Sequence, residues 1–524
     1  MSSTSPGQGQ WSGTWYGLPG EIQLLILRAL IHDGCPLSGF VTVCRQWQTV
    51  IERHIFSRIR LTPSRLANFD AMLQRNRVLV RYIWFCLELD EYDCATCAPT
   101  PETIPGEQEH QKAFEISGPD ITMAFRDLFS SLSTWNQHGG LTLDISLYSP
   151  SDSEHWFKYL TFVPDIPSNL PIDCRAKQAT STRKYHDPEH GWVAGFRQSA
   201  PPMPAFDKIF HPVMKNGRPF DDTRSELQWW DQLPTVPVVT CLLLRQQNRR
   251  RWKWDSLAHM IARLPRLREL HYEPWREWDY WQFSTYTGYF FLLQSVWRSN
   301  KSLKRLVVFE NFNQQYTCTM QRFQFEVGLA ERDAIRKANS LVGKMLALMS
   351  LKLEHVAASF IADATDFFEI EPSWEWPSLK SLVLTSKLLT PNETSTDIEA
   401  MLQTAASAAM KMPQLETMEI WNGRKGLAAL FRYQAPRKSQ PAVILWRGTW
   451  HLAMEAPVVQ AWKAVIHQHG GRGLDLVQEW LDKATIQSHG DALQQLMLSG
   501  QVIRPVSLQQ IQMEQKALEG VETR

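Results

Sequence analysis

The sequence lacks the long apolar runs, the abundant cysteine and the secretory leader that mark several large classes of protein. Its most apolar segment, residues 288–296 (GYFFLLQSV), is far shorter than the about 20 residues that a helix needs to cross a bilayer. The N-terminal MSSTSPGQGQWSGTWYG has neither the basic start nor the apolar stretch of a signal peptide. Only 8 of 524 residues are cysteine, and their spacing is irregular. We therefore expect reduced thiols, no membrane association, and a location in the cytoplasm and/or the nucleus.

An excess of charge of one sign and the common catalytic motifs are also missing. The 55 Lys and Arg nearly balance the 54 Asp and Glu, so the net charge of +1 gives no bulk attraction to nucleic acid. No GxSxG elbow, phosphate-binding loop, strand-linked GxGxxG or HExxH is present. Cys44 and His54 lie close in sequence, but on one helix they would be about 15 Å apart along its axis and could not act as nucleophile and base. We expect no catalytic activity and no cofactor.

Two short stretches offer part of a metal-binding pattern. Cys94 and Cys97 form a CxxC motif, which is half of a zinc site, and His110 follows it, but a second histidine at zinc-finger spacing and a second CxxC are missing. His186 and His190 lie four residues apart in HDPEHG, but the proline between them would disrupt the helix that could bring them together. We interpret the cysteines as paired reduced thiols, with zinc as the weaker alternative, and HDPEHG as a polar loop.

Tryptophan is abundant, with 22 residues, and two segments combine it with arginine: RQQNRRRWKW (245–254) and EPWREWDYWQF (273–283). Such segments could bind single-stranded nucleic acid or dock an acidic protein segment. They could equally form a solvated turn with the indoles packed into the core. We expect no nucleic acid here, because nothing else in the chain supports it. The residues that we select as candidates for binding a protein target are Arg249, Arg250, Trp252, Trp275, Trp278 and Trp281.

A weak repeat of the form LxxLxL begins near residue 234. Its first positions are Val239, Leu267, Leu303, Leu353, Leu379 and Leu415. Intervening segments such as 254–264, 335–349 and 398–412 have helical patterns. Alternating strands and crossover helices predict an irregular, leucine-rich-repeat-like α/β solenoid with parallel strands. An ordinary α/β domain with several parallel strands is the alternative, because the spacing is uneven and no consensus asparagine follows the strands.

The N-terminal region has the pattern of three short helices. Residues 20–31 (GEIQLLILRALI) are apolar on nearly all sides, so this helix must be covered from two directions. In the third helix, Val43, Trp47, Val50, Ile51 and His54 follow one helical face. Three helices of this size cannot bury so much apolar surface alone. A partner protein or the rest of the chain must cover them.

These helices resemble an F-box. The stretches LPGEIQLLILRAL, PLSGFVTVCRQWQTVIE and FSRIRL are similar to the family pattern LPxE[IL]xxxIL, a small apolar helix, VCRxW and a final apolar turn. Gly20 departs from the pattern. The later stretches LVRYIWFCLELDEYDCATC and LTLDISLYSPSDSEHWFKY resemble F-box proteins of filamentous fungi, whose C-terminal regions are sometimes leucine-rich-repeat-like.

The resemblance implies a substrate receptor of an SCF-type cullin-RING ubiquitin ligase. Such a receptor docks on a Skp-family adaptor, and through it on a cullin scaffold, while its C-terminal region binds the target protein and no residue is catalytic. The alternatives are an adaptor-bound scaffold outside ubiquitin ligation, or an enzyme with a site assembled within residues 150–450. By family analogy the adaptor-binding residues are Leu18, Pro19, Ile22, Leu25, Ile26, Leu37, Val43, Cys44, Trp47 and Val50.

The sequence thus predicts an α/β protein in which a three-helix F-box precedes the repeat-like region and a helical C-terminus. The last stretch, Ser507–Gly520, is polar, and we expect it to be peripheral. The predicted boundaries are a disordered tail over 1–17, the F-box over 18–60, a helical and strand-containing linker over 61–140, a target-binding region over 141–450, and C-terminal helices over 451–524.

Overall fold

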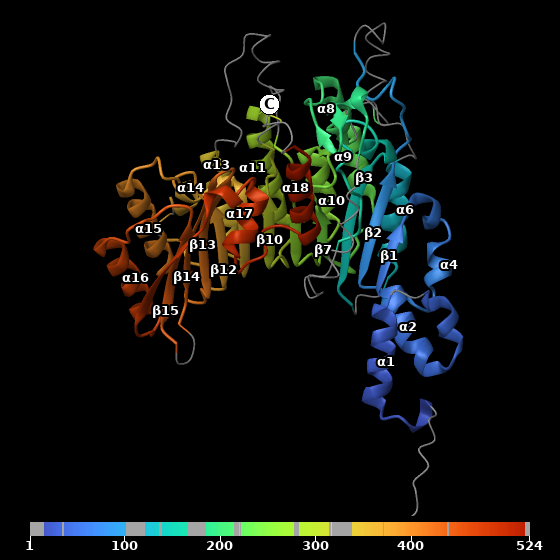
Figure 1. The fold of residues 1–524 in the computed structure, drawn as a ribbon. Helices are drawn as coiled ribbons and strands as arrows, with labels where there is room; N and C mark the ends of the chain where they lie inside the picture. The colour runs from blue at the N-terminus through green and yellow to red at the C-terminus, as the bar shows by residue number, and fades with distance from the viewer. Residues whose placement is uncertain are drawn as a thin grey trace, which may run out of the picture.

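The computed structural model describes residues 15–33, 36–100, 121–135, 139–165, 185–213, 220, 222–276, 282–313, 316, 338–369, 371, 373–436 and 440–518. Within them the structure is α/β, as predicted, and is built on one large, mostly parallel sheet (Figure 1). Its twelve strands are β1 (Arg58–Leu61), β2 (Tyr82–Glu88), β3 (Leu141–Tyr148), β7 (Val239–Leu244), β9 (Glu269–Tyr272), β10 (Arg305–Phe309), β11 (His355–Asp363), β12 (Ser381–Thr385), β13 (Thr417–Arg424), β14 (Leu427–Gln434), β15 (Ala442–Gly448) and β16 (Leu474–Trp480).

The spatial order of these strands follows their order in the chain. All neighbouring pairs are parallel except β13–β14 and β14–β15, which are antiparallel. A two-residue turn joins β13 to β14, and its Gly426 has a φ of +69°, which glycine adopts without the steric cost that other residues meet. The six strands predicted from the LxxLxL repeat are all present, as β7 and β9 to β13.

One ladder of apolar residues crosses the whole sheet in register. The middle position of each LxxLxL copy pairs with the same position in the next strand, and the ladder extends beyond the repeat in both directions. Its members are Ile59, Ile83, Leu143, Leu242, Leu270, Leu306, Val356, Leu382, Met418, Tyr433, Ile444 and Leu476. Since alternate residues of a strand point to opposite faces, this register places one apolar row on one face.

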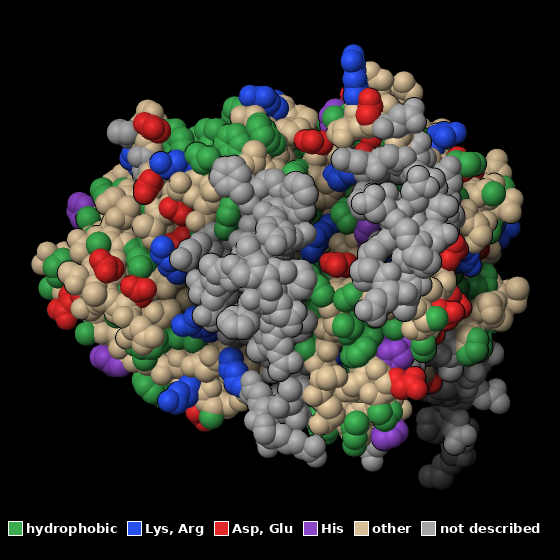
Figure 2. All heavy atoms as spheres, turned by 90° about the horizontal axis from the view of Figure 1, so that it is seen from above, with side chains coloured by type: hydrophobic (Ala, Val, Ile, Leu, Met, Phe, Trp, Pro, Cys, Tyr) green, Lys and Arg blue, Asp and Glu red, His purple; other side chains and the backbone are tan. Residues whose placement is uncertain are grey.

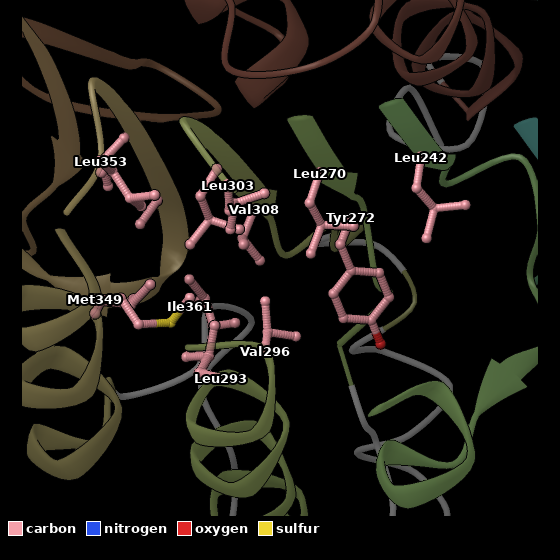
Figure 3. Packing of buried hydrophobic residues seen from close by; sticks show 14 of the residues in the cluster. Leu242, Leu270, Tyr272, Leu293, Val296, Leu303, Val308, Met349, Leu353 and Ile361 are labelled. Carbon is pink, nitrogen blue, oxygen red and sulfur yellow. The ribbon is translucent and has the colours of Figure 1, made fainter. Parts of the chain in front are cut away.

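Helices cover that face of the sheet. They are α6 (Ile121–Ser133), α9 (Thr223–Gln232), α10 (Trp254–Ala262), α11 (Gln282–Ser299), α13 (Ser340–Ser350), α14 (Ala364–Phe368), α15 (Ser395–Ala409) and α16 (Ala456–Gln468). Figure 3 shows Leu293 and Val296 of α11 pointing toward the strand residues Leu270 and Val308. Gly288 lets α11 approach α10 closely, because a Cβ at this position would lie 1.9 Å from the Trp254 ring.

The opposite face of the sheet is covered by the C-terminal residues. Helices α17 (His489–Leu496) and α18 (Pro505–Leu518) lie across it in front of the strands (Figure 1). The prediction that Ser507–Gly520 is peripheral is wrong for α18, whose Ser507, Gln510 and Glu514 are buried. The three side chains hydrogen-bond to residues that follow the strands, namely Glu273, Thr161 and Arg249. A sequence pattern does not reveal partners so remote in the chain. The region predicted to be helical after residue 450 also contains the edge strand β16.

The N-terminal residues form a small helical unit at the end of the sheet where β1 begins (Figure 1). It consists of η1 (Trp15–Gly17), α1 (Gly20–His32), the 3-10 helix η2 (Leu37–Thr42) and α2 (Arg45–Ser57), and α2 runs directly into β1. Trp15–Gly17, predicted as part of the tail, is thus a turn of helix. Val43 precedes α2 and His54 is exposed, so the predicted apolar stripe of this helix is shorter than expected.

The remaining described elements are short. The linker after β1 holds α3 (Pro63–Leu66), α4 (Phe69–Leu73) and η3 (Arg77–Leu79). Between β3 and α10 lie η4 (Pro150–Ser153), η5 (Pro188–His190), β4 (Trp192–Val193), β5 (Phe196–Arg197), α8 (Met203–Ile209), β6 (Pro212–Val213) and β8 (Arg251–Trp252), and η6 (Lys483–Thr485) follows β16. No described helix is both long enough and apolar enough to cross a membrane.

His489 of α17 makes the stability of this C-terminal layer sensitive to acid. Its ring stacks on Phe312 with centroids 4.3 Å apart, and its Nε2 lies 2.8 Å from Oδ1 of Asn311. Burial lowers the pKa of His489 to about 3. The unfolded chain, with a histidine pKa near 6.5, binds this proton first, so stability falls as the pH drops below about 6.5.

We expect a change from pH 7 to pH 5 to remove about 2 kcal/mol through His489. His489→Gln keeps an amide donor for Asn311 but removes the titratable imidazole. Between pH 7 and pH 5 the unfolding free energy of this variant should therefore fall by about 2 kcal/mol less than that of the wild type. Urea unfolding of both proteins at pH 5, 6 and 7 measures the difference. Parallel pH profiles for the two proteins would contradict the assignment.

Candidate partner-binding surface

Helix α1 has one face turned inward and one turned to solvent. Leu27 is fully buried, and Gln23 is buried one turn earlier, where its Nε2 donates to the carbonyl oxygens of Trp15 and Leu18 at 2.8 and 3.0 Å. Residues 23 and 27 lie four apart and therefore share a face. This inward face is held against α2 by Gln46, whose Nε2 donates to Oε1 of Gln23 at 2.7 Å.

The outward face of α1 is apolar. Ile22, Leu25 and Ile26, at positions i, i+3 and i+4, have 42%, 56% and 41% of their surface exposed. We call these three residues the α1 apolar face. Val43, just before α2, is exposed to a similar degree at 58%. The sequence predicted that α1 is covered from two directions, and the described residues of the chain cover it from only one.

The predicted adaptor-binding residues fall into two groups. The exposed group is Pro19, Ile22, Leu25, Ile26 and Val43, and the half-buried group is Leu18, Leu37, Cys44, Trp47 and Val50. Trp47 packs edge-on against Trp15 at 5.0 Å and beside Phe40 at 5.9 Å, so its indole joins η1, η2 and α2. Leu24 and Ile55 are also exposed apolar residues, and the prediction missed them.

The helical unit is fixed to the sheet rather than tethered by a linker. Helix α2 continues into β1 without a connecting loop, and it also contacts η3. Glu52 of α2 accepts hydrogen bonds from Gln48 Nε2 at 2.9 Å and from Arg75 at 2.6 Å. Glu52 thus links α2 to the segment before η3. The α1 apolar face therefore has a set position relative to the sheet.

The candidate target-binding residues on the far side of the chain are not exposed. Arg249, Arg250, Trp252 and Trp275 are all buried, and Trp278 and Trp281 lie outside the described residues. Arg249 pairs with Glu514 of α18, whereas Trp252 and Trp275 are packed within hydrophobic clusters. A partner could not reach these side chains in the folded chain. We therefore leave them out of the proposed target-binding surface.

Each of the two arginines is paired with an acid far away in sequence. Arg249 lies 2.7 Å from Oε2 of Glu514 and stacks on Trp275, with its guanidinium carbon 3.6 Å from a ring centroid. Arg250 donates to both carboxylate oxygens of Asp152, at 2.8 and 3.1 Å. The basic run thus forms buried ion pairs. A run of arginines alone does not show this, because the acidic partners lie about a hundred residues or more away.

A small cavity lies beside these residues at the carboxyl ends of β7 and β9. Its lining includes Arg249, Trp252, Glu273 and Trp275, and its volume is about 50 Å³. That is room for a few water molecules, whereas typical ligand pockets have about 300–1,000 Å³. This cavity is therefore too small for a typical small-molecule ligand.

On the face that Figure 2 shows, the charged side chains of the described residues do not mark a further binding surface. Acidic and basic side chains are interspersed there among the described residues, without a broad patch of one sign. Another exposed apolar group lies on the edge strand β16, where Leu476, Val477 and Trp480 have exposed side chains. An edge strand with exposed apolar residues can pair with another chain.

No curated protein matches the chain. Residues 298–504 match the model of DUF6546, a family of unknown function, and this stretch runs from the end of α11 through β16 and α17 to the residue before α18.

Proposed function

We propose that the protein is an F-box-type substrate receptor of an SCF-type cullin-RING ubiquitin ligase, which docks on a Skp-family adaptor through its N-terminal helices. The observation that carries the proposal is the α1 apolar face. Among the described residues, six of the seventeen exposed large apolar side chains lie in the short segment 22–55. Exposed apolar residues gathered in this way mark sites of protein interaction.

The packing of the helical unit supports the same role. Its own core is small: among the side chains that the structure describes between residues 15 and 57, the fully buried large apolar ones are Leu27 and Ile51. A partner that covers Ile22, Leu25 and Ile26 would gain roughly 25 cal/mol for each Å² of apolar surface removed from water. It would also cover the second side of α1, a helix that is apolar on nearly all sides.

We assign the binding of the target protein to the region of the large sheet. Parallel strands that follow one another in chain order, with crossover helices on one face, support the leucine-rich-repeat-like architecture that we propose for residues 141–450. A receptor of this kind acts without catalytic residues, by raising the effective concentration of target lysines near a ubiquitin-charged enzyme. The rigid junction of α2 with β1 would hold the target in a set position for this transfer.

The proposal predicts that a charge on the α1 apolar face blocks the adaptor. Leu25 is 56% exposed, so Leu25→Asp should fold normally but place an unpaired carboxylate in an apolar interface. We expect the affinity of the full chain for a purified Skp-family adaptor to fall at least tenfold, about 1.4 kcal/mol, measured by titration calorimetry.

Leu341→Asp is the matched control, because Leu341 is 60% exposed near the start of α13, away from the N-terminal helices. It should bind the adaptor like the wild type. Failure of the wild-type chain to bind under conditions in which a known F-box protein binds would overturn the proposal, as would equal binding by Leu25→Asp. Adaptor binding without recovery of a cullin would instead favour an adaptor-bound scaffold outside ubiquitin ligation.

A further inference from the structure

Two cysteines and two histidines meet beyond the carboxyl ends of β2 and β3. Cys94 and Cys97 lie in the loop after β2, His155 follows β3, and His190 ends η5. The Sγ of Cys94 is 3.5 Å from Nδ1 of His155, and the Sγ of Cys97 is 3.5 Å from Nε2 of His190. The donor atoms of Cys94, His155 and His190 all lie within 4.8 Å of one another, and Cys97 adjoins this group of three through His190.

The outer nitrogen of each imidazole is held by an acceptor. Nε2 of His155 lies 3.2 Å from the carbonyl oxygen of Tyr92, and Nδ1 of His190 lies 2.8 Å from Oδ2 of Asp187. An imidazole that donates its proton outward presents an unprotonated nitrogen inward. Metal-binding histidines are oriented in this way by a carbonyl or carboxylate outside the ligand shell.

The surroundings hold these side chains in place. The Tyr92 ring stacks on His155 at 5.5 Å, and Trp156 meets His190 edge-on at 5.4 Å. Trp192 donates its Nε1–H to the carbonyl oxygen of His155 at 3.2 Å. Cys97 and both histidines are buried and Cys94 is exposed, so the cluster has one side open for an ion to enter.

We propose that Cys94, Cys97, His155 and His190 form a zinc site. Zn–S bonds of about 2.3 Å and Zn–N bonds of about 2.0–2.1 Å at tetrahedral angles separate sulfur from nitrogen by about 3.6 Å. Both sulfur–nitrogen distances between neighbouring donors match this value. Two thiolates neutralise Zn²⁺, and a set of two thiolates and two imidazoles selects zinc over harder cations.

Four protein ligands leave no position open for water or substrate, so the zinc is structural. It ties the loop after β2 to the segment after β3 and to the turn at residues 187–197. These three segments are distant in sequence, and the zinc joins them in the way that a disulfide would in other proteins. The site is independent of the proposed adaptor docking, which involves the opposite end of the strands (Figure 1).

A second group of donors fits a cation less well. Cys241, Glu269 and His271 also come together on the sheet, and like Cys94, His155 and His190 they provide three donor atoms within 4.8 Å of one another. The guanidinium of Arg504 interacts electrostatically with both Cys241 and His271, and its positive charge would repel a cation bound there. This group serves as an internal comparison in the test.

The test is the metal content of the purified full chain, measured by elemental mass spectrometry. We expect about one zinc per chain in the wild type, and close to none in Cys97→Ser and His190→Ala. Cys241→Ser and His186→Ala are the matched controls and should retain zinc, since Cys241 belongs to the other group and His186 is an exposed neighbour of His190. Cobalt in place of zinc should give the visible absorption of a tetrahedral thiolate site.

Exposed Cys94 provides a variant that is expected to keep the fold. Cys94→Ser should lose zinc while the far-ultraviolet circular dichroism stays unchanged. A chelator should lower the melting temperature of the wild type but not that of Cys94→Ser. A wild-type chain that binds neither zinc nor cobalt would overturn the proposal, as would loss of zinc in Cys241→Ser alone. Neither outcome would bear on adaptor binding.

Discussion

A chain that ends at Arg504 is expected to lose cooperative folding. Such a chain lacks α18, whose Gln510 accepts from the backbone N–H of Thr161 at 3.0 Å and donates to the carbonyl oxygen of Tyr159 at 2.9 Å. Its removal also leaves Arg249 without Glu514 in a buried place. One buried charge without its partner costs about 3–5 kcal/mol, and a folded domain is stable by only about 5–15 kcal/mol.

The loss should be visible as a missing or much broadened melting transition and as binding of a hydrophobic dye to the uncovered sheet. A chain that ends at Leu518 is the control, because it keeps every described residue of α18. Glu514→Ala, which removes only the acid, should fall between the two. If the chain ending at Arg504 melted at the same temperature as the control, α18 would have no structural role.

Arg245→Met has the second large expected effect. Arg245 and Asp144 are both buried, and Nε of Arg245 donates to the two carboxylate oxygens at 3.0 and 2.9 Å. Its guanidinium also donates to the carbonyl oxygen of Val163 at 3.0 Å. Removing one partner of such a pair leaves the other charge unpaired, and we expect a loss of about 3–5 kcal/mol at pH 7 in urea unfolding.

The effect of Arg245→Met should depend on pH in a defined direction. Burial raises the pKa of Asp144 even beside Arg245, and Arg245→Met removes the positive charge that lowers it, so in the variant this pKa lies still further above its value in the unfolded chain. A carboxyl whose pKa is raised on folding destabilises the folded state above the unfolded pKa of about 3.9, and this cost decreases as the pH falls toward that value. The difference between variant and wild type should therefore shrink as the pH falls.

A double variant separates this charge effect from lost packing. Arg245→Met with Asp144→Leu removes both charges and should recover most of the stability lost in the single variant, because an apolar pair often replaces a buried ion pair without loss. A double variant as unstable as Arg245→Met would mean that the other bonds of Arg245 matter more than its charge.

The six strands of the repeat were predictable from sequence because their signal is local. Alternating apolar residues such as those at 267, 270 and 272 mark a buried strand, and each copy of the repeat carries the same short pattern. The same holds for α1 and α2, whose apolar residues recur at helical spacing. Which of those residues face outward was not predictable, because it depends on how η1 and η2 pack against them.

The buried polar contacts could not be predicted because their partners are remote in sequence. The RQQNRRR run has the appearance of a surface patch until Asp152 and Glu514 are brought beside it. The Cys94–Cys97 motif is half of a zinc pattern, and its expected third ligand, His110, lies outside the described residues. The histidines that join it, His155 and His190, are far from zinc-finger spacing, and only the folded chain brings them together.

The agreement between strand order and chain order has a consequence for synthesis on the ribosome. Each strand from β2 to β16 can add to an edge that is already formed, so the sheet can grow as the nascent chain emerges. Arg245 meets Asp144 early in this growth. Arg249 and Glu273 instead wait for residues 504–514, which are made more than 200 residues later. Until then one face of the sheet is uncovered, and the unfinished protein is a natural client for chaperones.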